Sequence, residues 1–125
     1  MNKVIWLLFV VLIAGSVYWL TKTPGRIGKL DTFADCLKVN GAKFYGAFWC
    51  PHCQNQKALF GSSARLLPYI ECSTPDGRSQ LPVCDNAGVK GYPTWKFLDG
   101  TIKNGEVSLI DLSKATDCPL PEGYK

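Results

Sequence analysis

Two cysteines separated by two residues constrain this chain more than any other feature, because they stand where a strand should meet a helix. The run before them, residues 43–49, is apolar and aromatic, and it predicts a buried strand over Lys43–Phe48. The run after the first cysteine, through Phe60, suits a helix. A proline in the first helical turn gives up no hydrogen bond, which places Cys50 at the N-cap and Pro51 at the first helical position.

A cysteine at that place is expected to react with disulfides. Unpaired amides and the helix dipole both favour an anion on Cys50. His52 would add hydrogen bonding or positive charge, although an exposed histidine in a helical turn is the alternative. Exchange needs one accessible, acidic thiol and a second within reach, which Cys53 supplies. We therefore expect Cys50 to be substantially thiolate near neutral pH.

The N-terminal part of the chain carries an unbroken uncharged run, Val4–Leu20. As a helix it would extend about 26 Å, near the lower limit for a hydrocarbon core of roughly 30 Å. Trp6 at one end and Trp19 at the other resemble interfacial anchors. The run predicts a membrane segment, and a cleaved signal peptide ending near residues 14–16 is the alternative.

The remaining chain is long enough for one compact domain. The predicted division is a membrane anchor or uncleaved signal over 1–21, a linker over 22–29, a folded domain over 30–118 and a tail over 119–125. The linker is rich in glycine and proline, as short tethers are.

The cysteines also indicate a compartment. There are six, an even number, which would be unusual in a reducing cytosol. The lysines and arginines beside the apolar run do not favour an exported C-terminus. We give the cysteines more weight and expect the domain on the exoplasmic side, whether periplasmic, extracellular or lumenal.

Turn residues predict alternating helices and strands. In the first half we expect a helix over 31–39, the strand 43–48, and a helix from 51 that breaks near 61–63 and stops before 68. A strand over 69–72, a polar loop over 73–80 and a helix over 81–89 follow. The last elements are a hairpin over 94–103, with a two-residue turn at Asp99-Gly100, and a helix over 108–115. This order predicts an α/β fold with a central mixed sheet flanked by helices.

This order, the Trp49-Cys50-Pro51-His52-Cys53 site and Gly91-Tyr92-Pro93-Thr94 together resemble the thioredoxin fold over about residues 30–116. More narrowly, residues 44–54, 69–72 and 91–95 are similar to the thioredoxin-like domains associated with bacterial vitamin K epoxide reductase homologues, which are exoplasmic disulfide carriers. The Pro-His pair also resembles the periplasmic oxidant DsbA.

The resemblance implies roles. Cys50 would be the exposed nucleophile and Cys53 the more buried resolving thiol, with Pro51 and His52 between them. Pro93 matches the family's cis-proline beside the active site. The residues Trp49, Tyr92 and Thr94 are expected to contact the substrate, with the Tyr92 backbone pairing with the substrate strand.

One position departs from the family. Thioredoxin and DsbA carry a buried acid six residues before the first cysteine, where this chain has Phe44. Another group or water would then handle the proton of Cys53. Glu71 is a possible substitute, but a surface carboxylate at a strand edge is the favoured interpretation.

The other four cysteines are expected to form structural disulfides. Cys72 and Cys84 bracket the polar loop and could clamp it, which leaves Cys36 and Cys118 to join the first helix to the tail. Free buried thiols are the alternative.

Several functions are disfavoured. One C-x-x-C lacks the paired ligands of a zinc site, and the basic residues are too scattered for nucleic acid. We expect no metal and no cofactor beyond the redox-active disulfide, and a monomer.

The favoured interpretation is a membrane-tethered thiol:disulfide oxidoreductase that passes the Cys50–Cys53 disulfide to reduced exported proteins. A quinone-coupled membrane oxidase of the vitamin K epoxide reductase or DsbB type would reoxidise it. One alternative is a reductase or isomerase, including a reductant for cytochrome c maturation. Another, of a different class, is a peptide-binding module with a permanent Cys50–Cys53 bridge.

Overall fold

A mixed four-stranded sheet forms the centre of the fold, in the computed structural model, which describes residues 2–21 and 26–124. The strand order is β2-β1-β3-β4. The strands are β1 (Lys43–Gly46), β2 (Tyr69–Glu71), β3 (Thr94–Lys96) and β4 (Ile102–Asn104). The pair β1–β2 is parallel, and the pairs β1–β3 and β3–β4 are antiparallel.

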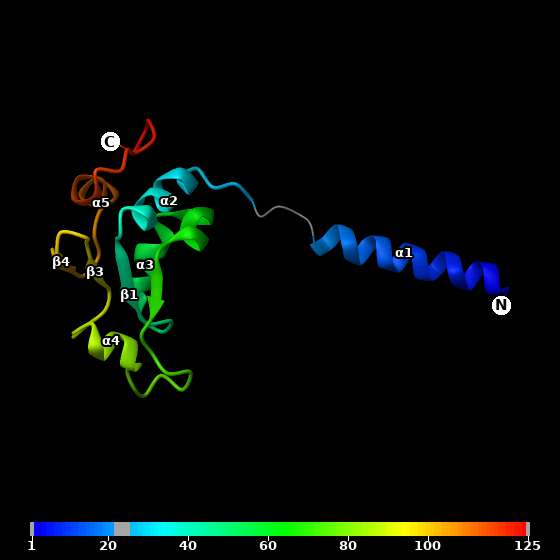
Figure 1. The fold of residues 1–125 in the computed structure, drawn as a ribbon, viewed down its shortest axis with the longest axis horizontal. Helices are drawn as coiled ribbons and strands as arrows, with labels where there is room; N and C mark the ends of the chain where they lie inside the picture. The colour runs from blue at the N-terminus through cyan, green and yellow to red at the C-terminus, as the bar shows by residue number, and fades with distance from the viewer. Residues whose placement is uncertain (1, 22–25, 125) are drawn as a thin grey trace.

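Helices flank this sheet (Figure 1). They are α2 (Asp31–Val39), α3 (Pro51–Ala58), α4 (Pro82–Asn86) and α5 (Leu109–Thr116), with a 3-10 helix, η1 (Gly61–Leu66), after α3. The break at residues 61–63 and the bounds of α2 are as predicted. A mixed sheet with flanking helices fits an α/β, thioredoxin-like fold.

The core is centred on β1 and β3. Phe44 and Trp95 are fully buried, and their rings stack with centroids 4.8 Å apart. From α2, Phe33 and Leu37 are buried against the same core. Stacked aromatic pairs of this kind fill a core and add to its stability beyond area burial alone.

Strand β1 ends two residues before the predicted end at Phe48. The amide of Cys50 donates to the carbonyl of Ala47 at 3.0 Å, which closes a turn between β1 and α3. Phe48 and Trp49 are about half exposed, at 50% and 49%. Their aromatic character therefore belongs to the rim of the Cys50 site, and not to the sheet.

The predicted two-residue hairpin turn is wrong. The amide of Phe97 donates to the carbonyl of Thr101, and the amide of Gly100 donates to the carbonyl of Phe97. A two-residue Asp-Gly turn of type I′ needs positive φ at both residues, whereas here Gly100 has φ +87° and Asp99 does not. The loop therefore has three residues, with glycine in the left-handed conformation.

The predicted helix over 81–89 is shorter, because α4 ends at Asn86. Gly88 has φ +69°, and its amide donates to the carbonyl of Asp85 at 2.8 Å. Glycine commonly ends a helix in this way. Val89 follows with its side chain buried.

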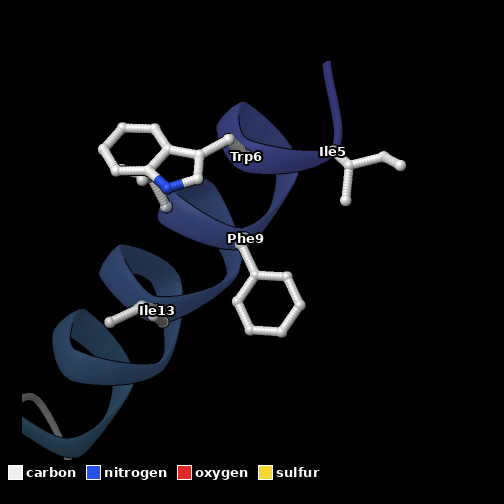
Figure 2. A pocket seen from close by; sticks show the side chains of 5 residues that line it. Ile5, Trp6, Phe9 and Ile13 are labelled. Atoms are coloured by element: carbon white, nitrogen blue, oxygen red, sulfur yellow. The ribbon is translucent and has the colours of Figure 1, made fainter. Parts of the chain in front are cut away.

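Helix α1 (Lys3–Thr21) lies apart from the sheet (Figure 1) and has no buried residue. It has 19 residues, and an 18-residue stretch of it has a mean hydropathy of 2.3, so it is long and apolar enough to cross a membrane, although a signal sequence would pass the same test. Figure 2 shows the side chains of Ile5, Trp6, Phe9 and Ile13 projecting from it. The hollow between them is a surface feature of this helix and is remote from the cysteines. Residues 22–25 of the predicted linker lie outside the described residues.

Candidate active site

Cys50 occupies the N-cap of α3, with extended backbone angles (φ −79°, ψ 118°), and Pro51 is in the first helical turn. The Cys50 carbonyl accepts the amide of Gln54 at 3.1 Å, which begins the helix. This is the placement predicted from the sequence. Cys50 therefore lies at the N-terminal end of the helix dipole, which favours a negative charge there, although its side chain makes no capping hydrogen bond.

Cys50 and Cys53 are both free thiols, and both are buried. Cys50 is 5% exposed and Cys53 is 1% exposed, so the expected exposed nucleophile is in fact largely covered. The Cys50 thiol donates to the backbone carbonyl of Tyr92 at 3.7 Å, which shows that the segment before Pro93 lies against it. The order of exposure still makes Cys50 the more accessible sulfur.

The Tyr92–Pro93 peptide bond is cis, and Pro93 is fully buried beside the site. Thr94 is 2% exposed, and its hydroxyl donates to the carbonyl of Gly91 at 2.8 Å and contacts Asn104 Oδ1 at 3.0 Å. The side chain of Thr94 is thus buried and hydrogen-bonded at the start of β3, and the substrate contact expected of this residue stays a prediction.

Trp49 forms one wall next to Cys50. Its indole nitrogen donates to the hydroxyl of Ser73 at 2.8 Å, and its ring meets the Tyr92 ring edge-on at 6.0 Å. The loop that follows β2 thus reaches the active-site rim through Ser73. Half-exposed aromatic rings beside a reactive sulfur offer a surface on which a peptide can pack.

His52 lies against an acid that the sequence did not indicate. Its Nδ1 is 2.7 Å from Glu106 Oε1, and its side chain is 70% exposed. Asn55 Nδ2 donates to the same oxygen at 3.2 Å, and these two hydrogen bonds lower the pKa of Glu106. Glu106 follows β4, far from the cysteines in sequence, so no local pattern could have identified it. Stabilisation of the Cys50 thiolate by His52 stays a prediction.

The surroundings of Cys53 are apolar. Burial raises its pKa to about 12, a hydrogen bond with the Ala47 backbone lowers it, and the neighbouring thiol of Cys50 raises it further. Phe44, at the position of the family's acid, is fully buried and stacked, so it supplies no proton acceptor.

Glu71 ends the edge strand β2 and is partly exposed, as its favoured interpretation expects, but its carboxylate is also hydrogen-bonded. Its Oε1 accepts the amides of Phe48 at 3.2 Å and Ser73 at 2.9 Å, and its Oε2 accepts the hydroxyl of Tyr69 at 2.8 Å. Glu71 therefore links the turn before Cys50, the loop after β2 and the Tyr69 ring.

The remaining cysteines form two disulfides in the pairs that the sequence analysis favours. Cys72 and Cys84 join the end of β2 to α4, and Cys36 and Cys118 join α2 to the chain after α5. Two thiols of the six are therefore left free at the candidate active site. Within residues 2–21 and 26–124, no group of three or more histidine, cysteine or acidic side chains is placed to hold a metal ion.

Comparisons with known proteins point to the same chemistry. Thiol-disulfide oxidoreductase LTO1 of Arabidopsis thaliana is 41% identical over 87 residues, which are 66% of this chain and 23% of that protein. A protein disulfide-isomerase of Humicola insolens is 35% identical over 77 residues, which are 58% of this chain and 15% of that protein. The chain thus spans less than a quarter of the length of these curated relatives. No family model matches the chain. The similarities support a thioredoxin-like oxidoreductase.

Proposed function

We propose that this chain is a membrane-tethered thiol:disulfide oxidoreductase that donates the Cys50–Cys53 disulfide to reduced exported proteins. The observation that carries the proposal is the free pair itself. Of six cysteines, four are bonded, and the two that are free lie at the N-terminus of α3. That position stabilises a thiolate, and a thiolate with a second thiol nearby is what disulfide exchange requires.

In the oxidising direction, a substrate thiolate attacks Cys50 and the Cys50–Cys53 bond breaks. Cys53 leaves with the electron pair and takes up a proton. The second thiol of the substrate then loses its proton and attacks the mixed disulfide, so the substrate becomes oxidised and Cys50 is released as a thiolate. Trp49 and the backbone of Tyr92 would hold the substrate, and His52 would support the Cys50 thiolate.

The proposal also includes a membrane anchor and an enzyme that reoxidises Cys50 and Cys53. Helix α1 would anchor residues 30–118 to the membrane on the exoplasmic side, supported by its length and by two structural disulfides. A quinone-coupled membrane oxidase of the vitamin K epoxide reductase or DsbB type would reoxidise Cys50 and Cys53. The support for this partner is the resemblance of residues 44–54, 69–72 and 91–95 to domains that work with such enzymes.

A reductase or isomerase is the second candidate. It is favoured by the similarity to proteins named protein disulfide-isomerase. The same cysteines would then act in the opposite direction, with Cys50 attacking a substrate disulfide and Cys53 resolving the adduct.

Trapping of mixed disulfides tests the shared mechanism. In the full chain, Cys53→Ala removes the resolving thiol, so covalent adducts through Cys50 should accumulate in cells. Non-reducing electrophoresis before and after dithiothreitol treatment would detect them. Cys50→Ala is the matched control and should give none. Equal, mild losses of activity from both variants, without adducts, would contradict the proposal.

A further inference from the structure

The buried thiol of Cys53 lies on the same helix face as a lysine. Cys53 and Lys57 are four residues apart in α3, and residues with that spacing are neighbours on a helix, with about 5–6 Å between their Cβ atoms. Cys53 faces the core, whereas Lys57 is partly buried and reaches toward the edge of the sheet. A cation is therefore placed one turn beyond the buried sulfur.

The ring of Tyr69 packs against both groups. The Lys57 ammonium lies 3.4 Å from the centroid of the Tyr69 ring. A Cβ on Gly46 would meet Tyr69 Cε2 at 2.8 Å and Cys53 Sγ at 2.9 Å, so the ring and the sulfur press on the same point of β1. The Tyr69 ring thus contacts the ammonium of Lys57 and packs on β1 at the same point as the sulfur of Cys53.

A hydrogen bond fixes the ring in turn. The hydroxyl of Tyr69 donates to Glu71 Oε2 at 2.8 Å, and the other oxygen of Glu71 accepts two backbone amides. The hydroxyl end of the ring is thus held in place beneath the ammonium, and the face of an aromatic ring attracts a cation.

We propose that Lys57 is the cation that stabilises the Cys53 thiolate, with Tyr69 and Glu71 as the residues that position it. The inference deepens the proposed function and rests on it. It identifies a substitute for the acid that Phe44 replaces, although Lys57 acts by attracting the thiolate and not by accepting the proton. In agreement with the geometry, the charge of Lys57 lowers the pKa of Cys53, in the same direction as a stronger effect from a hydrogen bond with the Ala47 backbone and against the larger effect of burial.

The step that this charge assists is balanced without a further reactant. In the mixed disulfide of Cys50 with glutathione, Cys53 loses its proton to solvent and attacks Cys50 Sγ. The Cys50–Cys53 bond forms, the bond to glutathione breaks, and glutathione leaves with the electron pair and a proton. In the reverse direction, Lys57 stabilises Cys53 as the leaving thiolate.

The test follows glutathione release from this mixed disulfide in the full chain, formed at low pH and transferred to buffers of rising pH. Lys57→Met keeps the aliphatic stem over Tyr69 but removes the charge. An opposite charge of this kind shifts a pKa by about one unit or more. The fraction of Cys53 present as thiolate then falls about tenfold. The remaining thiolate is more basic and therefore more nucleophilic, which raises its rate of attack about threefold. We expect release to slow about three- to fourfold and its pH profile to move up by about one unit.

Three further variants separate charge from packing. Lys57→Arg keeps the cation and should restore the wild-type profile. Lys114→Met removes a lysine from the last turn of α5 and should change nothing. Tyr69→Phe keeps the ring beneath the ammonium but loses the hydrogen bond to Glu71 that positions the ring, so it should slow release less than Lys57→Met does.

The proposal is overturned if Lys57→Met leaves the pH profile unchanged, if Lys57→Arg slows release as much as Lys57→Met, or if Lys114→Met shifts it equally. It is also overturned if Tyr69→Phe slows release while Lys57→Met does not. The assay needs only Cys50, Cys53 and glutathione. An intact Lys57 effect in a chain that exchanges no disulfide with proteins would therefore contradict the proposed function alone.

Discussion

At the scale of single residues, the site depends on how closely the backbone of β1 approaches the buried sulfur. Gly46 is the last residue of β1 and is fully enclosed. Its φ is not positive, so its role is not one of backbone freedom. The absence of a side chain is what lets Cys53 and Tyr69 pack against the strand.

Gly46→Ala should therefore destabilise the domain and slow exchange through Cys53. The added Cβ would lie 2.8 Å from Tyr69 Cε2 and 2.9 Å from Cys53 Sγ, so a ring and a sulfur must move. Overpacking of this kind typically costs about 1–3 kcal/mol, which denaturant unfolding would measure.

Gly91→Ala is the matched control, because a Cβ there meets nothing within 4 Å. It should change the free energy of unfolding by less than about 0.5 kcal/mol. Similar losses in both variants would show that close packing on Gly46 is not what the strand requires.

At the scale of elements, an ion pair fastens the start of α2 to η1. Arg65 donates from Nη1 to Asp31 Oδ1 at 2.7 Å and from Nη2 to Asp31 Oδ2 at 2.6 Å. This two-point contact holds the pKa of the Asp31 carboxyl far below its usual range. Asp31 also lies in the first turn of α2, where a negative charge is favourable.

Because of the Asp31–Arg65 ion pair, the stability of the protein should depend on pH. A carboxyl whose pKa is lower in the folded state contributes stability above its unfolded pKa of about 3.9, and this contribution is lost as the pH falls below that value. Arg65→Met should therefore destabilise the protein at neutral pH, and its difference from wild type should shrink below about pH 4. Thermal unfolding across this pH range would measure it. A constant difference at all pH values would contradict the account.

Helices and strands could be predicted from the sequence where nearby residues, such as a proline or a glycine, set their bounds. Pro51 placed the start of α3, Gly61 its interruption, and the alternating order gave the mixed sheet. The hairpin loop was mispredicted because Asp99-Gly100 fits two turn types, and only the hydrogen bonds of Phe97 distinguish them.

Contacts between elements that are far apart in the sequence could not be predicted. The pairing of His52 with Glu106 and the hydrogen bond from the Phe48 amide to Glu71 join residues that are far apart in the sequence, so no local pattern indicates them. The burial of Cys50 has the same origin, because the Tyr92 carbonyl that contacts it comes from another element. The positions of the active-site cysteines could be predicted from the sequence, whereas the groups from other elements that contact them could not.

At the scale of the whole molecule, the two disulfides and the free cysteines Cys50 and Cys53 have separate roles. The Cys36–Cys118 bond closes a span of 82 residues and joins the two ends of the folded domain. Long closed spans restrict the unfolded chain most in the loop-entropy account. The Cys72–Cys84 bond fixes the loop that contacts Trp49. The free pair is then the part of the molecule left to change its redox state.

The equilibrium redox potential of the Cys50–Cys53 pair tests the account most directly. The full chain in detergent would be titrated against glutathione, with the change in tryptophan fluorescence as the readout and Cys50→Ala as the blank. The account predicts a reversible two-electron couple well above the glutathione couple, toward the roughly −120 mV of a strong oxidant. A potential near or below thioredoxin's, roughly −270 mV, would contradict a disulfide donor and favour the reductase. A pair that no glutathione ratio reduces would contradict exchange altogether.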